Sequence, residues 1–391
     1  MSSAVISRRG VDRLRAGHPW IYRSDVLSCD GQPGDLVRVL TERDRPLGWA
    51  FWSGASQISL RMVLDATRES GDSLNERKLF ADRLERAIEY RAVLAIDATA
   101  CRLVHGEADR LPALIVDRYA DWLVVQTLSQ GMDRRLPMIV ELLVEIAKPR
   151  GILARNDPKV RRLEGLDEKV EVVYGEVPET IEVSEGRIRH RVDVRHGQKT
   201  GLFLDQVENH AAAVRYARGA ALDAFSYLGG FALQIAPHCE RVITLDSSAP
   251  GVAATREAAQ RNGITNLDAR EGNVFDELRE LEIARERFHT IVLDPPAFAR
   301  NRAAVERAAA GYKEINLRAL KLLEPGGHLV TCSCSYNVDE ALFAAIVEEA
   351  AADARVAVAL VEKRMQARDH PVLVGVPETH YLKCFILRKL A

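Results

Sequence analysis

Two short strings in the C-terminal half of the chain combine residue types that can act on a nucleobase. Asp294 is followed by Pro295 and Pro296, which fix the backbone and lack N–H donors, so that a carboxylate and carbonyl oxygens face whatever enters. Such acceptors fit the amino edge of a base. Cys332 and Cys334 end the next predicted strand, and a thiolate there can add to C6 of a pyrimidine and make C5 nucleophilic enough to take a methyl group. The alternatives are a Pro-Pro step that only ends a strand and thiols that only fill a core.

A second group of residues indicates a cationic nucleoside cofactor. Gly229 and Gly230 follow an apolar strand that contains Asp223, and without a Cβ they let a ligand approach the backbone closely. Their spacing does not match G-x-G-x-x-G, and an acid before the turn repels a pyrophosphate but attracts a sulfonium or amino group. Asp246 ends the next strand, where it can bind a ribose diol, and Asn273 follows the third strand, where its amide can meet an adenine. Helix capping is the alternative for both. The set favours S-adenosylmethionine over a dinucleotide.

The elements that carry these residues alternate regularly. Alternation of helix and strand is typical of a parallel, doubly wound sheet, with its ligand site at the carboxyl ends of the strands. The pattern predicts strands at 220–225, 242–245, 267–271, 290–293, 327–332, 356–361 and 381–387, and helices at 206–217, 231–238, 249–262, 302–322 and 338–351. Alternate residues of a strand share a side, so both cysteines are expected to point the same way.

Two further segments precede this sheet. Residues 1 to about 65 hold short strands at 35–39, 46–52 and 58–64 between Gly and Pro turns, which predicts a small barrel. Its arginines and aromatic rings suit RNA, whose phosphates take the charge and whose unpaired bases stack on rings, although the same rings can form the barrel core. A helix at 75–96 then leads to a central segment. Strands at 111–116, 122–127, 151–154 and 186–194 and a helix at 133–147 predict a compact α+β layer there.

Composition and charge exclude several classes of protein. With 391 residues, 47% hydrophobic and 28% charged, the chain is long enough for two or three ordinary globular domains. A net charge of -2 argues against binding polyanions by bulk charge and leaves only regional basic surfaces, at 187–199 and 297–321. Six scattered cysteines form neither a zinc spacing nor a disulfide framework. Without a membrane-length apolar run or a signal peptide, we expect a cytoplasmic protein.

Several strings resemble one known family along the whole chain. They are Gly-His-Pro-Trp-Ile-Tyr at 17–22, Leu-Pro-Ala-Leu-Ile-Val-Asp-Arg-Tyr at 111–119, Arg-Arg-Leu-Glu-Gly-Leu at 161–166, Gly-Gln-Lys-Thr-Gly-Leu-Phe-Leu-Asp-Gln at 197–206, Asp-Pro-Pro at 294–296 and Ser-Cys-Ser at 333–335. In these motifs the chain is similar to the bacterial and archaeal ribosomal RNA cytosine-C5 methyltransferases that carry an N-terminal PUA domain. The resemblance implies an α/β protein with a PUA-like RNA-binding barrel at 1–70, a small central α+β domain at 71–195 and a Rossmann-like class I S-adenosylmethionine-dependent methyltransferase domain at 196–391.

The resemblance also implies a reaction and a role for individual residues. It implies that Cys334 attacks C6 of a cytidine in 23S ribosomal RNA, that Asp294 holds this base, and that C5 receives the methyl group. The resemblance implies that Phe225, Ser226, Gly229 and Asp246 line the cofactor site. The full set of cofactor-binding residues that we expect is Asp223, Phe225, Ser226, Tyr227, Gly229, Gly230, Asp246, Ser247, Asn273, Val274, Asp294 and Pro295. The implied RNA contacts are Lys199, Asp205, Gln206, Phe298 and Arg300.

Two alternatives stay open at this point. One is methylation of an exocyclic amine of adenine or guanine in RNA, which needs no thiol. The other is a non-catalytic RNA-binding ribosome assembly factor. We expect no metal and no membrane partner, and a homodimer is left open.

Overall fold

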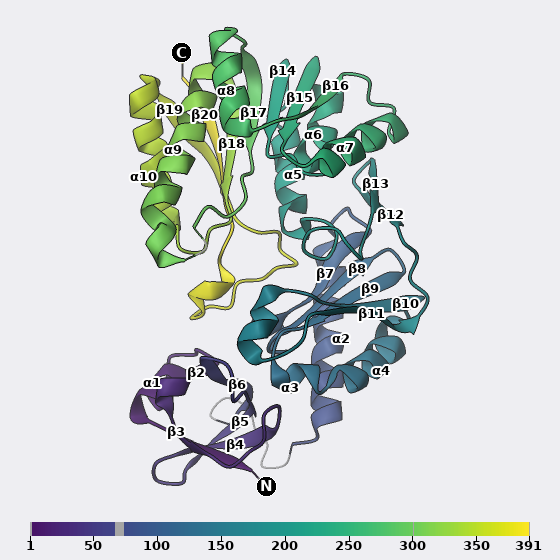
Figure 1. The fold of residues 1–391 in the computed structure, drawn as a ribbon, viewed down its shortest axis with the longest axis vertical. Helices are drawn as coiled ribbons and strands as arrows, with labels where there is room; N and C mark the ends of the chain where they lie inside the picture. The colour runs from purple at the N-terminus through teal and green to yellow at the C-terminus, as the bar shows by residue number, and fades with distance from the viewer. Residues whose placement is uncertain (1, 67–73, 300, 391) are drawn as a thin grey trace. The chain divides into compact units, whose positions relative to one another are not determined.

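The computed structural model describes residues 2–66, 74–299 and 301–390, and the chain in it divides into two compact units (Figure 1). Unit 1 runs to Val183 and also takes in Val192–Gly201 and Asp369–Thr379. Unit 2 holds Ser184–Arg191, Leu202–Arg368 and the chain from His380 onward. The expected domain boundary near residue 70 lies outside the described residues, and the division into three domains stays a prediction.

The N-terminal part of unit 1 is a six-stranded sheet in the order β2-β6-β5-β4-β1-β3. The predicted strand at 46–52 is confirmed. Gly48 on this strand adopts φ +138°, and a Cβ there would lie 1.9 Å from the Leu64 carbonyl oxygen, so only glycine fits. Trp49 and Phe51 are buried, as expected if these rings form the core. The elements are β1 Ser3–Ile6, α1 Arg8–Arg15, β2 Trp20–Tyr22, β3 Val26–Cys29, β4 Leu36–Thr41, β5 Pro46–Trp52 and β6 Ile58–Asp65.

The central part of unit 1 is a five-stranded sheet in the order β11-β10-β9-β8-β7. Its core combines leucines and valines of the strands with the apolar faces of α2 and α4, as expected for an α+β layer. Sequence reasoning placed β9 at its observed bounds and missed β7 and β11. The elements are α2 Glu76–Leu94, β7 Ala100–His105, β8 Leu114–Tyr119, β9 Trp122–Thr127, α3 Gln130–Asp133, α4 Leu136–Ala147, β10 Gly151–Asn156 and β11 Lys169–Gly175.

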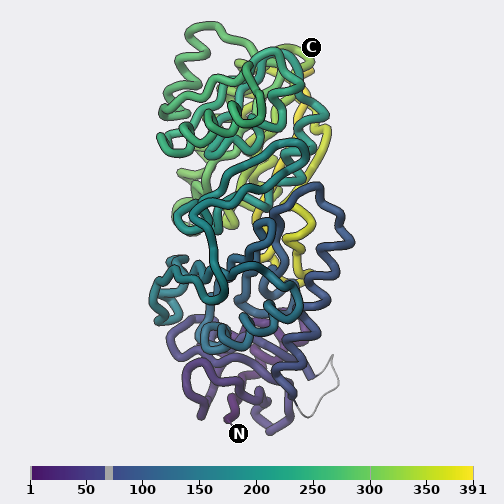
Figure 2. The backbone as a smooth tube through the Cα atoms, turned by 90° about the vertical axis from the view of Figure 1, so that its right-hand side faces the viewer, coloured from purple at the N-terminus to yellow at the C-terminus, as the bar shows by residue number. Residues whose placement is uncertain are grey.

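Residues 369–379, which we call the C-terminal strap, belong to unit 1 although they come late in the sequence. Arg91 on α2 donates to both carboxylate oxygens of Asp109 at 2.5 and 2.8 Å and to the Asp369 carbonyl oxygen at 2.8 Å. The Asp369 carboxylate accepts from the backbone N–H of Arg102 at 2.8 Å. In Figure 2 the yellow strap runs beside the blue elements of the central sheet. Buried, charge-assisted bonds therefore fix the strap in unit 1.

Unit 2 is built on a seven-stranded sheet in the order β16-β15-β14-β17-β18-β20-β19, with helices packed against it. The first five strands of this order are parallel, as predicted, but β20 is antiparallel to both neighbours, so the expectation of a wholly parallel sheet is wrong at this edge. The strands are β14 Ala220–Ala224, β15 Arg241–Asp246, β16 Leu267–Glu271, β17 Phe288–Leu293, β18 Leu323–Ser333, β19 Val358–Arg364 and β20 Lys383–Lys389.

The helices of unit 2 follow the predicted alternation with one addition. Helix α8 lies between β16 and β17, where the sequence pattern predicted none. The helices are α5 Val207–Val214, α6 Gly230–Ile235, α7 Ala249–Arg261, α8 Val274–Ile283, α9 Val305–Leu322 and α10 Glu340–Ala354, and a small hairpin of β12 Ile181–Glu185 and β13 Ile188–Val192 precedes them. Strand order reverses between β14 and β17, and in open α/β sheets such a switch point is where ligands bind. Among the helices described, none is long and apolar enough to cross a membrane.

Candidate active site

The strand before the glycine turn carries a buried carboxylate with one unbonded oxygen. Asp223 on β14 is 0% exposed, and its Oδ2 accepts from the backbone N–H of Ala232 at 2.9 Å. Its Oδ1 is buried and has no hydrogen-bond partner. Burial raises the pKa of Asp223 to about 8. Because an unbonded buried acceptor is costly, this oxygen fits a cationic donor such as the amino group of S-adenosylmethionine.

The turn that follows is strained and tightly packed. Phe225 and Tyr227 both adopt left-handed backbone conformations, at φ +66° and +47°, as non-glycine residues at ligand sites often do. A Cβ on Gly230 would lie 2.6 Å from Cε1 of His210, whose Nδ1 is 2.8 Å from Oε1 of Glu185. Burial disfavours the charged form of His210, but the Glu185 carboxylate outweighs it and raises the pKa of His210. Packing therefore requires the glycine, and the close ligand approach that the sequence suggests here stays a prediction.

Asp246 forms hydrogen bonds to the loop that follows β14 and to the loop that follows β15. Its Oδ2 accepts from the backbone N–H of Tyr227 at 2.7 Å, and its Oδ1 accepts from that of Ser248 at 2.8 Å. The cap of α7 is Ser248, whose Oγ accepts from Gly251, so the capping alternative for Asp246 does not hold. Each carboxylate oxygen keeps a further lone pair, which leaves Asp246 able to accept from a ribose diol. Ser247 beside it is exposed.

Asn273 follows the third strand, β16, and the nearby ring of Phe275 packs against two phenylalanines from other loops. Asn273 caps α8, with its Oδ1 accepting from the backbone N–H of Phe275 at 2.9 Å, so the capping alternative is correct for this residue. The rings of Phe225, Phe275 and Phe298 contact one another at centroid distances of 6.0 to 6.2 Å. Phe298 also packs on Tyr312 at 4.7 Å. Sequence reasoning missed Phe275, because the helix that presents it was not predicted. A contact between Asn273 or Val274 and an adenine stays a prediction.

The two candidate nucleophiles occupy different surroundings. Cys334 is partly exposed, and its Sγ lies 3.7 Å from the Pro295 carbonyl oxygen, within the Asp-Pro-Pro turn. Cys332 is fully buried opposite Cys384 of β20, and burial raises its pKa well above its ordinary value. Because β18 ends at Ser333 and Cys334 lies beyond it, strand alternation does not fix the direction of Cys334, and the expectation that both thiols share a side stays a prediction. Of the two thiols, Cys334 is therefore the partly exposed one, and its sulfur contacts the turn that Asp294 begins.

The side chain of Asp294 is held by Gln206, one of the residues that were expected to touch RNA. Gln206, which is 2% exposed, donates from Nε2 to Oδ1 of Asp294 at 2.9 Å and accepts at Oε1 from Asn209 at 2.7 Å. Asp205, equally buried, accepts from the hydroxyl of Tyr381 at 2.8 Å. These bonds make Gln206 a support for Asp294. Contact of either residue with RNA stays a prediction.

The remaining expected RNA contacts are less informative. Lys199 is exposed and belongs to unit 1, and Arg300 lies outside the described residues. Within the basic region that follows the Asp-Pro-Pro turn, Arg318 and Lys321 both pair with Glu282, at 2.5 and 3.1 Å. Because both cations already pair with a carboxylate of the chain, they are less available to bind phosphates. The described residues hold no group of three or more side chains suited to a metal ion.

Comparison with known proteins gives consistent results. A family model described as a PUA-like domain matches residues 5–64, and one described as an S-adenosylmethionine-dependent methyltransferase matches residues 154–388. Two relatives named ribosomal RNA large subunit methyltransferase I are each 37% identical. The one from Aeromonas hydrophila aligns over 99% of this chain and 100% of its own length, and the one from Vibrio cholerae over 100% of both.

Solved structures agree on the fold. A Streptococcus mutans protein assigned as a SAM-dependent methyltransferase superposes with a TM-score of 0.83 at 19% identity, over 99% of this chain and 100% of its own. A second solved structure, of a protein assigned as a methyltransferase and complexed with SAH, superposes with a TM-score of 0.85 at 20% identity, over 99% of this chain and 100% of its own. At these identities the likeness concerns the fold alone.

Proposed function

Because this chain belongs to the S-adenosylmethionine-dependent methyltransferase family, we propose that it methylates C5 of a cytidine in 23S ribosomal RNA. The observation that carries the proposal is the thiol of Cys334 at 3.7 Å from the Pro295 carbonyl, one residue from Asp294. A methyltransferase of exocyclic amines has no use for a thiol at this point. The relatives named ribosomal RNA large subunit methyltransferase I and the PUA-like domain support ribosomal RNA as the substrate, and we expect such an enzyme in the cytoplasm.

The cofactor site consists of residues that fit S-adenosylmethionine. The unbonded Oδ1 of Asp223 is suited to its amino group, and the Asp246 carboxylate is suited to its ribose. Phe225 and Phe275 form an apolar wall suited to its adenine, beside Asn273. When bound, S-adenosylmethionine supplies the methyl group as a carbon attached to a cationic sulfur.

The protein residues act on the cytosine ring. The Cys334 thiolate attacks C6, the S–C6 bond forms, and the electron pair of the C5–C6 double bond becomes available at C5 to take the methyl group. A base then removes the C5 proton, the double bond returns, and the S–C6 bond breaks to release the thiolate. Asp294, held by Gln206, accepts from the amino group of the cytosine, which must leave its stack to reach this site.

A pair of matched variants tests this proposal. Cys334→Ala should abolish formation of 5-methylcytosine in 23S ribosomal RNA taken from a strain that lacks the gene, and should leave S-adenosylmethionine affinity nearly unchanged. Cys332→Ala should stay active, since that thiol is buried in the core. Nucleoside mass spectrometry measures the product, and calorimetry measures cofactor binding.

Three outcomes would contradict the proposal. Activity that survives Cys334→Ala would exclude this residue as the nucleophile. A methylated exocyclic amine as the product would favour the adenine or guanine alternative. An absence of heat with S-adenosylmethionine would favour a non-catalytic assembly factor.

A further inference from the structure

A buried lysine lies at the start of β20, next to the loop that carries Cys334. Lys383 is 2% exposed and sits opposite Ser333, the last residue of β18. Its Nζ donates to the carbonyl oxygens of Ser335 at 2.7 Å and of Tyr381 at 2.9 Å. A buried ammonium is costly unless its charge and its N–H groups are compensated. The two carbonyls satisfy two of its three N–H groups but bring no negative charge.

Among the described residues, no carboxylate forms an ion pair with this ammonium. Within the described part of the chain, both hydrogen bonds of the Lys383 Nζ go to backbone carbonyl oxygens and none goes to an Asp or Glu oxygen. Burial lowers the pKa of Lys383 to about 8, and among the groups that oppose this lowering the Cys334 thiolate acts more strongly than Asp339 or Glu340. Ser335, whose carbonyl holds the ammonium, directly follows Cys334 in the chain. The charge of the lysine is therefore held at the backbone carbonyl of the residue that follows Cys334.

We propose that Lys383 is a positioning residue that keeps Cys334 in its thiolate form, an inference that rests on the proposed role of Cys334 as the nucleophile. A neighbouring ammonium favours the thiolate over the thiol, as it does for other reactive cysteines. The thiol proton passes to solvent, the ammonium keeps its own protons, and the pair formed is a thiolate beside an ammonium. When the S–C6 bond forms, negative charge leaves the sulfur, and when that bond breaks the charge returns to the sulfur, where the same ammonium stabilises it. Lys383 therefore also favours release of the product.

The inference is tested by the reactivity of the thiol in the full-length protein without RNA. The rate of alkylation of Cys334 by iodoacetamide is measured against pH, with the modified peptide read by mass spectrometry so that the other cysteines do not interfere. In Lys383→Met the midpoint of this profile should move up by about one to two pH units, because an opposite charge at close range shifts a titration by that order. At neutral pH the alkylation rate should fall about tenfold or more.

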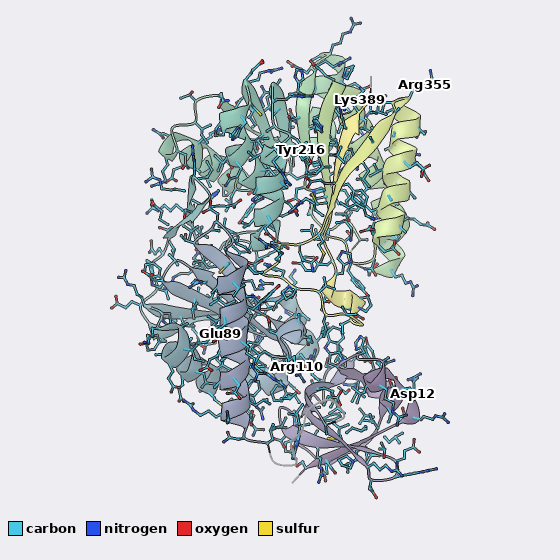
Figure 3. All side chains as sticks on the ribbon, turned by 180° about the vertical axis from the view of Figure 1, so that it is seen from behind. Asp12, Glu89, Arg110, Tyr216, Arg355 and Lys389 are labelled. Atoms are coloured by element: carbon cyan, nitrogen blue, oxygen red, sulfur yellow. The ribbon has the colours of Figure 1, made fainter. Side chains whose placement is uncertain are left out.

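Lys389 provides a matched control at the other end of the same strand. It lies at the end of β20 (Figure 3), and its Nζ also donates to two carbonyl oxygens, those of Leu320 at 2.9 Å and Leu323 at 2.6 Å. Lys389→Met removes a similar pair of bonds and should leave the alkylation profile of Cys334 in place. If the loss of either lysine on β20 changed Cys334 through the structure alone, the pH profile of Cys334 alkylation would shift in both Lys383→Met and Lys389→Met.

A second variant separates charge from folding. Lys383→Gln keeps N–H donors for the two carbonyls but removes the charge, so it should shift the profile as Lys383→Met does, with S-adenosylmethionine binding retained as the sign of a folded site. An unchanged profile in a folded Lys383→Gln protein would overturn the inference. Because alkylation needs no RNA, this result is independent of the proposed reaction: a shifted profile in an enzyme that makes no 5-methylcytosine would refute the reaction and leave the thiolate pairing standing.

Discussion

Replacing Asp223 with Asn should make the stability of unit 2 less dependent on pH. In the folded protein burial raises the pKa of Asp223 to about 8, against 3.8 for an ordinary Asp carboxyl. Between these values the folded state holds a proton that the unfolded state has released, so stability falls as pH rises. The loss is at most about 1.4 kcal/mol per pH unit and amounts to about 2 kcal/mol between pH 6 and pH 8. Asn does not titrate, so the variant does not lose this stability as pH rises.

Thermal unfolding of both proteins at pH 6 and pH 8 measures the effect. About 2 kcal/mol corresponds to about 4–8 °C in Tm for a unit of this size. The Tm of the variant minus the Tm of the wild type should therefore be larger at pH 8 than at pH 6 by that amount. Comparison with the wild type is needed because His210 also titrates, and its raised pKa acts in the same direction in both proteins. Calorimetry should show at the same time that the variant binds S-adenosylmethionine at least tenfold more weakly, since a carboxylate that meets an amino group has been lost. A Tm difference that is equal at both pH values would refute the reasoning.

Two other substitutions test the surroundings of the site. Gln206→Ala removes the donor that holds Asp294 and should lower kcat by about tenfold or more with little change in S-adenosylmethionine affinity, as shown by single-turnover kinetics and calorimetry; unchanged turnover would exclude the supporting role. Gly230→Ala places a Cβ 2.6 Å from the His210 ring and should destabilise the protein by about 1–3 kcal/mol in urea unfolding, and a neutral result would show that the turn can shift.

Local signals in the sequence were sufficient for most strands of the fold. Strands β5 and β9 are found at their predicted bounds, because short runs of apolar, aromatic or β-branched residues between turn residues are typical of strands. Helix α8 was missed although Asn273 caps it, since its charged residues obscure the apolar period. The antiparallel direction of β20 could not be predicted, because it depends on pairing between residues far apart in the sequence.

In the candidate site, too, the local sequence predicted some features, while others depend on residues far apart in the chain. Asp294 and Cys334 stand at strand ends in motifs whose residue types already suggest their chemistry, and the structure places the Cys334 sulfur against the turn that Asp294 begins. The support of Asp294 by Gln206 and the bonds of Lys383 to the Cys334 loop could not be read from the sequence. Each joins residues about fifty to ninety positions apart through side-chain hydrogen bonds, and no local periodicity encodes such pairs.

The C-terminal strap has a consequence for dividing this protein into parts. The chain leaves unit 2 after Arg368, contributes Asp369–Thr379 to unit 1, and returns at His380 to form β20. A single cut between the units therefore separates the C-terminal strap from Arg91. The C-terminal fragment keeps the strap without Arg91, and the N-terminal fragment keeps Arg91 without the strap. Each unit is built from several separate segments of the sequence. A single recombination crossover therefore cannot exchange either unit as a whole.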